Sequence, residues 1–241
     1  MAEVLSPEEI EKLLAAINAG ENDSDNSYIK QIYFDHPDGA RKMKKYDFKR
    51  PDRFLKKQCK AMESIFGTFS GLCTSSLSDR LRLPVNIHVA SVDELTYEEF
   101  IRSVPTPTTL VTVNMDPLKG NAILEIDPAI TISIINQLRL VYENNESKIS
   151  VIMKLFKEII VDMLDEIKDA WIKVIDLCPA IVMIDNVPQF VQIAQPSDMV
   201  ILVTMESKIG EIEGMINFCM PYAVIKPLIN KPPFLEVYIR R

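Results

Sequence analysis

The chain has 241 residues, a formal net charge of −7 and 47% hydrophobic residues, which is the composition of an ordinary globular protein. Its seven glycines are placed so that neither a GxGxxG turn nor a GxxxxGK[ST] loop can be formed, which excludes these two nucleotide-binding motifs. The acidic pI of about 5.0 argues against nucleic acid as a partner of the whole molecule, and no cofactor is expected.

The first predicted element is a short amphipathic helix within residues 1–18. Ser6 is a natural N-cap, Pro7 suits the first helical position, and Glu9 completes an S-x-x-E capping box. The acidic residues near the positive end of the helix are Glu8, Glu9 and Glu11. The apolar residues at helical spacing are Ile10, Leu13, Leu14 and Ile17. Because so short a helix is marginal alone in water, it must dock on its own domain or on a partner, and spacing alone leaves both open.

Residues 19–45 have the composition of a flexible linker, with the polar and acidic run GENDSDNS at its start. A basic stretch follows over residues 41–60, where ten Lys and Arg residues stand against two acids. The pattern favours a solvated helix face plus linker. An acidic partner, a membrane surface or nucleic acid are the alternatives for this stretch.

From about residue 46 the hydrophobic pattern becomes that of a folded domain. The predicted elements of its first half are, in order, a long helix from Pro51 to about Arg80, a strand over 85–89, a short helix to about Ser103 capped by Thr96 and Glu99, strands from Leu110 and over 122–126, and a helix opened by Pro128.

After a polar break the pattern repeats. A second long helix is predicted over about 148–177 and ended by Pro179, followed by the strand-like runs AIVMI, FVQIAQ, MVILVTM and GMINFCM and a last helix opened by Pro221. Ile216 is the expected counterpart of Ile123, 93 positions earlier. Residues 46–230 are therefore predicted to form one α/β domain of the α+β type, a pseudo-twofold duplication with long helices packed on a mixed or antiparallel sheet. Residues 231–241 form a C-terminal tail.

Candidate catalytic groups are few. Of the two histidines, His36 lies in a polar stretch and His88 in a strand, where it is expected to face solvent. The four cysteines are scattered and form no CxxC pair, so a metal site is not expected. No catalytic, cofactor-binding or metal-binding residue is assigned, and the chain is predicted not to be an enzyme.

One enzymatic alternative has a specific signature. Duplicated α/β domains of this layout include response-regulator phosphatases of the CheC type, which place a glutamate and an asparagine one helical turn apart as E-x-x-N. The two long helices here carry Glu63-x-x-Phe66 and Glu158-x-x-Val161 instead. Because a hydrophobic side chain cannot orient the attacking water, this chemistry is expected to be absent.

Several segments carry a family resemblance: YDFKRPDRF (46–54), SVDELTYEEFIRSVP (91–105), PLKGNAILEIDP (117–128) and PQFVQIAQPSDMVILV (188–203). They resemble the flagellar motor switch family FliM, and LSPEEIEKLL (5–14) is similar to that family's short N-terminal peptide. The resemblance implies a CheC-like middle domain without the phosphatase motif. It also implies a part in chemotaxis and flagellar rotation, at the cytoplasmic face of the inner membrane in the flagellar basal body.

The resemblance implies partners as well. Subunits of the family form a ring with FliM-like neighbours, the N-terminal peptide captures the phosphorylated regulator CheY, and the middle domain contacts the rotor protein FliG. By position, Ile10, Leu13, Leu14 and Ile17 would fill the groove of the regulator, Ser6, Pro7 and Glu9 would cap the helix, and Glu8 and Glu11 would pair with basic residues.

Two departures from the family pattern bear on these partners. The family usually carries a GGxG loop after the helix equivalent to residues 130–138, whereas QLRLVYENNESK contains no glycine. The possible rotor-protein contact, Arg139, Leu140, Val141 and Tyr142, is thus expected to differ in geometry, and a degenerate paralogue with an altered FliG contact is an alternative. The family's FliN-like domain would begin after Arg241, so FliN binding by the usual route is not expected.

Overall fold

The computed structural model describes residues 56–142 and 149–237, all within the compact unit Arg50–Arg241. The predicted N-terminal helix, the linker over 19–45 and the expected helix start at Pro51 lie outside the described residues. The helices are α3 (Lys56–Leu81), α4 (Tyr97–Ser103), α5 (Pro128–Tyr142), α6 (Ile149–Trp171), α7 (Tyr222–Ile225) and α8 (Pro232–Glu236), with the 3-10 helix η1 (Pro188–Phe190). The strands are β1 (Val85–Thr96), β2 (Thr109–Asp116), β3 (Asn121–Ile126), β4 (Cys178–Asp185), β5 (Met199–Ile209) and β6 (Ile212–Pro221).

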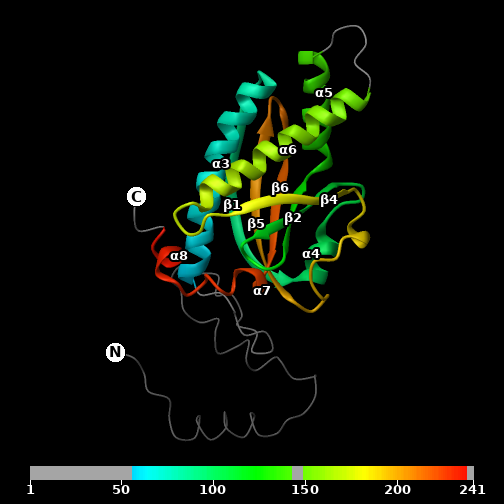
Figure 1. Cartoon of the computed structure of the whole chain (residues 1–241). Coiled ribbons are helices and arrows are strands. Elements are labelled where there is room, and N and C mark those ends of the chain that lie inside the picture. Colours follow the sequence, from blue (N-terminus) through cyan, green and yellow to red (C-terminus); the bar gives the residue numbers. More distant parts are fainter. Residues whose placement is uncertain (1–55, 143–148, 238–241) are drawn as a thin grey trace, which may run out of the picture. The chain divides into compact units, whose positions relative to one another are not determined.

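The six strands form one sheet in the order β1-β5-β6-β3-β2-β4, and every recorded neighbour pair is antiparallel (Figure 1). The order reads symmetrically from its centre. β3 and β6 meet in the middle, the hairpin partners β2 and β5 flank them, and β4 and β1 form the two edges. The predicted duplication with long helices on an antiparallel sheet is therefore confirmed.

The predicted correspondence between Ile123 and Ile216 is wrong, because the two side chains lie on opposite faces of the sheet. Ile123 lies in the cluster on one face of the sheet and Ile216 in the main core on the other. The residues of β3 and β6 that face the main core are all even-numbered, from Ala122 to Ile126 and from Ile216 to Met220, so a relation that preserves the faces needs an even offset here. The 93-position offset between Ile123 and Ile216 therefore cannot be the structural one.

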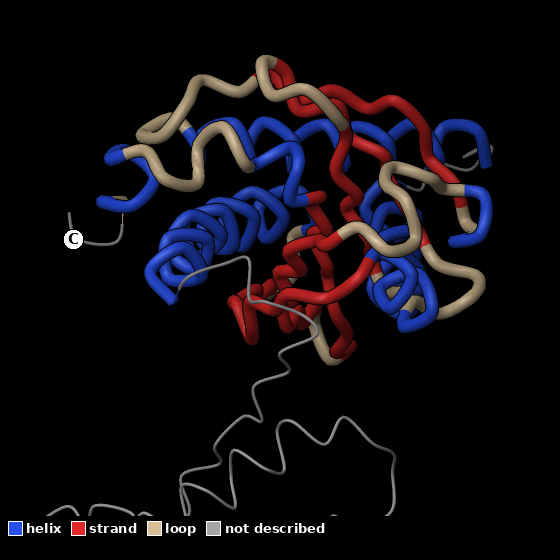
Figure 2. The backbone as a smooth tube through the Cα atoms, turned by 90° about the horizontal axis from the view of Figure 1, so that it is seen from below, coloured by secondary structure: helices blue, strands red, loops and turns tan. Residues whose placement is uncertain are grey.

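The main core lies between the sheet and the long helices α3, α5 and α6. Phe66 on α3 packs against Phe218 on β6, with ring centroids 4.9 Å apart. The opposite face is partly covered by a smaller cluster that includes Tyr97 and Phe100 of α4 and Val191. Figure 2 views the strands roughly end-on, with helices to either side of them.

The capping box predicted at the start of α4 is present in full. The backbone N–H of Glu99 donates to the Thr96 hydroxyl at 3.3 Å, and the backbone N–H of Thr96 donates to the Glu99 carboxylate at 2.8 Å. Two of the unpaired N–H groups at the helix start are thus satisfied. The backbone N–H groups of Tyr97 and Glu98 donate to the carbonyls of Asp198 and Pro196, so the segment before β5 completes the helix start that the local motif predicts.

Three expectations for the second half are wrong. α6 ends at Trp171, well before Pro179, and Pro179 lies in β4, an edge strand where proline costs no ladder hydrogen bond. The run FVQIAQ is η1 and irregular chain, whose buried Val191 packs on α4 instead of in a ladder. The last helix, α7, has only four residues, and α8 follows it.

A buried carboxyl joins the two halves of the sheet. Glu125 on β3 is 1% exposed, and it lies opposite Asn217 on β6, whose amide donates to it at 2.8 Å. Thr108 Oγ1 lies 2.5 Å from the other carboxyl oxygen and 3.0 Å from the Ile126 carbonyl. The Thr108 hydroxyl has one proton, so it can donate to only one of these two oxygens at a time. Burial raises the pKa of Glu125.

The variant Glu125→Gln tests this network. Folding raises the pKa of Glu125. The free energy of unfolding therefore falls as the pH rises through and above the ordinary pKa of a glutamate, because the carboxylate ionises more easily in the unfolded chain. We expect Glu125→Gln to match or exceed the wild type by about 1 kcal/mol at pH 8, with the gain disappearing near pH 4, in urea unfolding. Glu125→Ala should lose about 1–3 kcal/mol, because the partners stay buried and unpaired. Equal losses for both variants at pH 8 would contradict the conclusion that burial of the ionised Glu125 carboxylate weakens the fold.

Two glycines give a matched test of backbone geometry. Gly210, in the β5–β6 turn, has φ +59°, and a Cβ there would lie 2.6 Å from Leu83 Cδ2. Gly71, exposed on α3, has no atom within 4 Å of such a Cβ. Gly210→Ala should therefore cost about 1–2 kcal/mol and lower the Tm. Gly71→Ala should stabilise by about 0.5–1 kcal/mol. Equal Tm shifts in one direction would refute this account of the turn.

Candidate functional site

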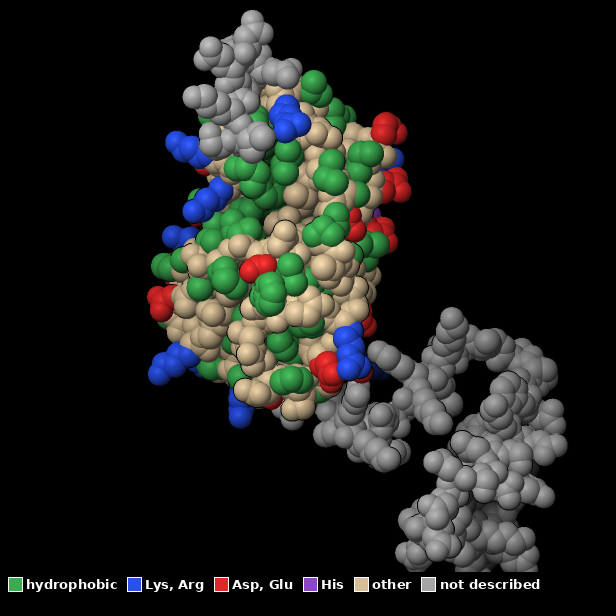
Figure 3. Space-filling view, turned by 90° about the vertical axis from the view of Figure 1, so that its right-hand side faces the viewer, with side chains coloured by type: hydrophobic (Ala, Val, Ile, Leu, Met, Phe, Trp, Pro, Cys, Tyr) green, Lys and Arg blue, Asp and Glu red, His purple; other side chains and the backbone are tan. Residues whose placement is uncertain are grey.

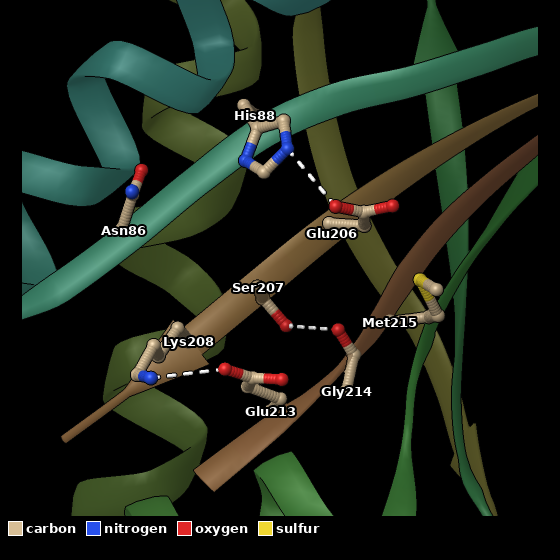
Figure 4. A pocket seen from close by; sticks show the side chains of 8 residues that line it. All are labelled: Asn86, His88, Glu206, Ser207, Lys208, Glu213, Gly214 and Met215. Carbon is tan, nitrogen blue, oxygen red and sulfur yellow. Dashed lines mark hydrogen bonds and ion pairs between the residues drawn. The ribbon is translucent and has the colours of Figure 1, made fainter. Parts of the chain in front are cut away.

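An open hollow of about 530 Å³ lies on the less covered face of the sheet, over β1, β5 and β6 (Figure 4). Two pairs of polar side chains that contact each other across neighbouring strands line it. His88 Nε2 lies 3.1 Å from Glu206 Oε2, and Lys208 Nζ lies 2.9 Å from Glu213 Oε1. The hydrogen bond between them raises the pKa of Lys208 and lowers that of Glu213. Each charge therefore already has its partner on the neighbouring strand.

The hollow does not assemble a nucleophile. Ser207 is 4% exposed, and its hydroxyl donates to the Gly214 carbonyl at 3.0 Å, whereas its neighbour Glu206 pairs with His88. Successive side chains of a strand point to opposite faces, so Ser207 and His88 are not aligned for proton transfer. His88 faces solvent as predicted, with a side chain 59% exposed.

The positions of the phosphatase motif hold other interactions. The position three residues after Glu63, where the motif has asparagine, is Phe66, and its side chain is fully buried against Phe218. No side-chain amide is therefore present there to orient a water. On α6, Glu158 accepts a hydrogen bond from Arg80 Nη2 at 2.7 Å, and Arg80 also binds Asp162. Arg80 thus fastens α3 to α6 at the place where the motif would stand.

Within residues 56–142 and 149–237, no group of three or more His, Cys, Asp or Glu side chains could hold a metal ion. None of the helices described is both long and apolar enough to span a membrane. Neither finding adds a chemical function to the surfaces described above.

The residues predicted to contact a rotor protein lie together at the C-terminal end of α5. Leu140 is 70% exposed and Tyr142 43%, Arg139 is exposed, and Val141 is half-buried. On α6, which packs beside α5, two further apolar side chains are exposed near the helix start, Val151 and Met153. This end of the helix pair exposes more apolar surface than a solvated helix end requires. The contact itself stays a prediction, as do the roles of the residues at 6–17, which lie outside the described residues.

A second exposed apolar surface was not predicted from the sequence. On the edge strand β4, Val182, Met183 and Ile184 are 57%, 39% and 40% exposed, and Phe190 of η1 is 73% exposed. Figure 3 shows apolar side chains over the middle of the face on this side of the molecule, with most charges at its margins. The run AIVMI predicted a strand, but nothing local told that this strand would form an edge of the sheet.

The model of the family described as flagellar motor switch protein FliM matches residues 55–233. The chain belongs to the FliM family. FliM of Treponema pallidum is 47% identical over 235 residues, covering 96% of this chain and 66% of that protein. FliM of Borreliella burgdorferi is 43% identical over 232 residues, covering 94% and 66%. The chain thus spans just under two thirds of the length of these curated relatives.

Solved structures agree with this family assignment. The FliM middle domain of H. pylori superposes with a TM-score of 0.66 at 29% identity, covering 73% of this chain and 98% of that one. FliM from a FliG–FliM complex of H. pylori gives a TM-score of 0.66 at 30% identity, covering 73% and 100%. The described residues therefore have the fold of a FliM middle domain.

Proposed function

We propose that this chain is a non-catalytic component of the flagellar motor switch. Its domain binds the rotor protein FliG, and its N-terminal helix receives the phosphorylated regulator CheY to bias the direction of rotation. The family match over residues 55–233 supports the general role. The observation that carries the FliG contact is the exposed apolar end of α5, where Leu140 is 70% exposed.

A neighbouring copy of the chain in a ring would contact a surface other than the one that binds FliG. A ring is built from heterologous contacts, in which one patch meets a different patch on the next copy. The β4 edge with Phe190 supports such a contact, because an apolar edge strand left open invites association. The assembly would sit at the cytoplasmic face of the inner membrane.

The variant Leu140→Asp tests the FliG contact. A carboxylate at this exposed position should weaken binding of the cognate FliG about tenfold or more without unfolding the domain, because an apolar contact becomes a desolvated charge. Val182→Asp, at a comparably exposed position on β4, serves as the control and should bind FliG normally. Calorimetric titration of the full chain gives both affinities.

Three outcomes separate the readings. If Leu140→Asp binds FliG weakly and Val182→Asp binds it normally, the contact is supported. If the two variants bind FliG with the same affinity, the contact is contradicted. A wild-type chain that binds no FliG would instead favour the paralogue with an altered rotor contact.

The variants Leu13→Ala and Ile10→Ala test the regulator contact. Each shortens the predicted apolar stripe and should weaken binding of phosphorylated CheY about tenfold, because ~1.5 kcal/mol of apolar burial is lost. Lys12→Ala, off the stripe, is the control and should change the affinity little. Fluorescence titration against phosphorylated and unphosphorylated CheY reports the preference, and equal affinity for the two forms would defeat the switching role. Faster loss of the aspartyl phosphate on addition of the chain would instead identify a phosphatase.

A further inference from the structure

A groove of about 590 Å³ opens at the end of the domain where α3 finishes, the β5–β6 hairpin turns and α5 passes (Figure 1). The start of β1 lines it as well, and the lining residues are Leu83, Pro84, Val85, Asn86, Ser133, Lys208, Ile209, Gly210, Glu211 and Ile212. Ile212 is 44% exposed. The groove thus combines apolar side chains, one of them accessible, with the polar side chains Asn86, Lys208 and Glu211.

The groove is preformed by tight backbone contacts. The Gly210 N–H donates to the Pro84 carbonyl at 2.9 Å, which ties the hairpin turn to the chain that leaves α3. Gly214 on β6 packs closely against α5: a Cβ at this position would lie only 2.7 Å from Ile130 Cγ1. Rigid walls of this kind lower the ordering cost of receiving a partner.

The groove is continuous with the exposed end of α5. Ile132, Asn136 and Leu140 follow one another at four-residue spacing, and all are exposed, Ile132 by 57% and Leu140 by 70%. At 1.5 Å per residue this stripe is about 12 Å long. Ser133, which follows Ile132 in α5, lines the groove, so this helix extends from the groove to Leu140.

The size of the surface bears on its occupant. A specific interface covers about 800 Å² on each partner. Residues 139–142 alone are too few for that area. The groove supplies adjacent apolar area at the same end of the domain.

We propose that the FliG contact extends along α5 into this groove, which receives an apolar side chain of FliG. The proposal rests on the proposed function. The chemistry expected of the partner is an apolar anchor flanked by carboxylates, because Arg82 and Arg139 are both exposed along this end of the domain. Neither arginine forms an ion pair within the described ranges.

The variant Ile212→Ser tests the groove, and Met215→Ser is its matched control. Both residues lie on β6 with similar exposure, 44% and 40%, but they are three positions apart and so point to opposite faces of the sheet. In titration of the full chain with cognate FliG, Ile212→Ser should bind about tenfold more weakly. Met215→Ser should stay within about twofold of the wild type, and Ile212→Met should largely restore binding. Thermal unfolding of each variant checks the fold.

A cysteine at position 212 gives a second readout. In a Cys178→Ser background, which removes the exposed cysteine, Ile212→Cys carrying a short photocrosslinker should couple to FliG, and Met215→Cys should not. If Leu140→Asp weakens FliG binding but Ile212→Ser does not and no crosslink forms, the groove proposal is overturned while the proposed function stands. If the wild-type chain binds no FliG, the proposed function fails first.

Discussion

The pairing of β3 with β6 is the constraint on which the rest of this domain depends. Three ladders join the two halves, β1–β5, β2–β4 and β3–β6, and the last lies at the centre of the sheet, from Ile123 opposite Cys219 to Ile126 opposite Ile216. A slip of one residue would turn Leu124 and Ile126 away from the main core. It would also separate Glu125 from Asn217, so the buried polar pair specifies the same register as the apolar alternation.

The surfaces that matter for function lie where this central packing stops. The titratable groups of the sheet face are paired across strands, as His88 is with Glu206, and the helices that would carry a phosphatase motif are fastened by Arg80. Exposed apolar side chains gather at the end of α5, in the groove beside it and on the β4 edge. These are features of a protein that works through contacts with other chains.

The elements that could be predicted from sequence are those whose signals are local. The capping box at Thr96, the alternation that starts β1 and the two long helices each depend on neighbouring residues, and the structure confirms them. The run FVQIAQ alternates like a strand, yet Val191 is buried by α4, which precedes it by some ninety residues. The exposure of β4 and the groove beside Leu83 depend on which strand becomes an edge and on where the hairpin turns. No local pattern encodes either.

The attachment of α3 has a mechanical consequence. Its first turns pack against the C-terminal segment, where Gln58 Nε2 donates to the Ile229 carbonyl at 3.3 Å, and its last turn leads into the groove at Leu83. With 26 residues the helix is about 39 Å long. The first turn of α3 and the proposed rotor contact therefore lie about one helix length apart. Because the sheet and the helices form one close-packed body, a displacement at one end of α3 would have to be accommodated at the other end as well.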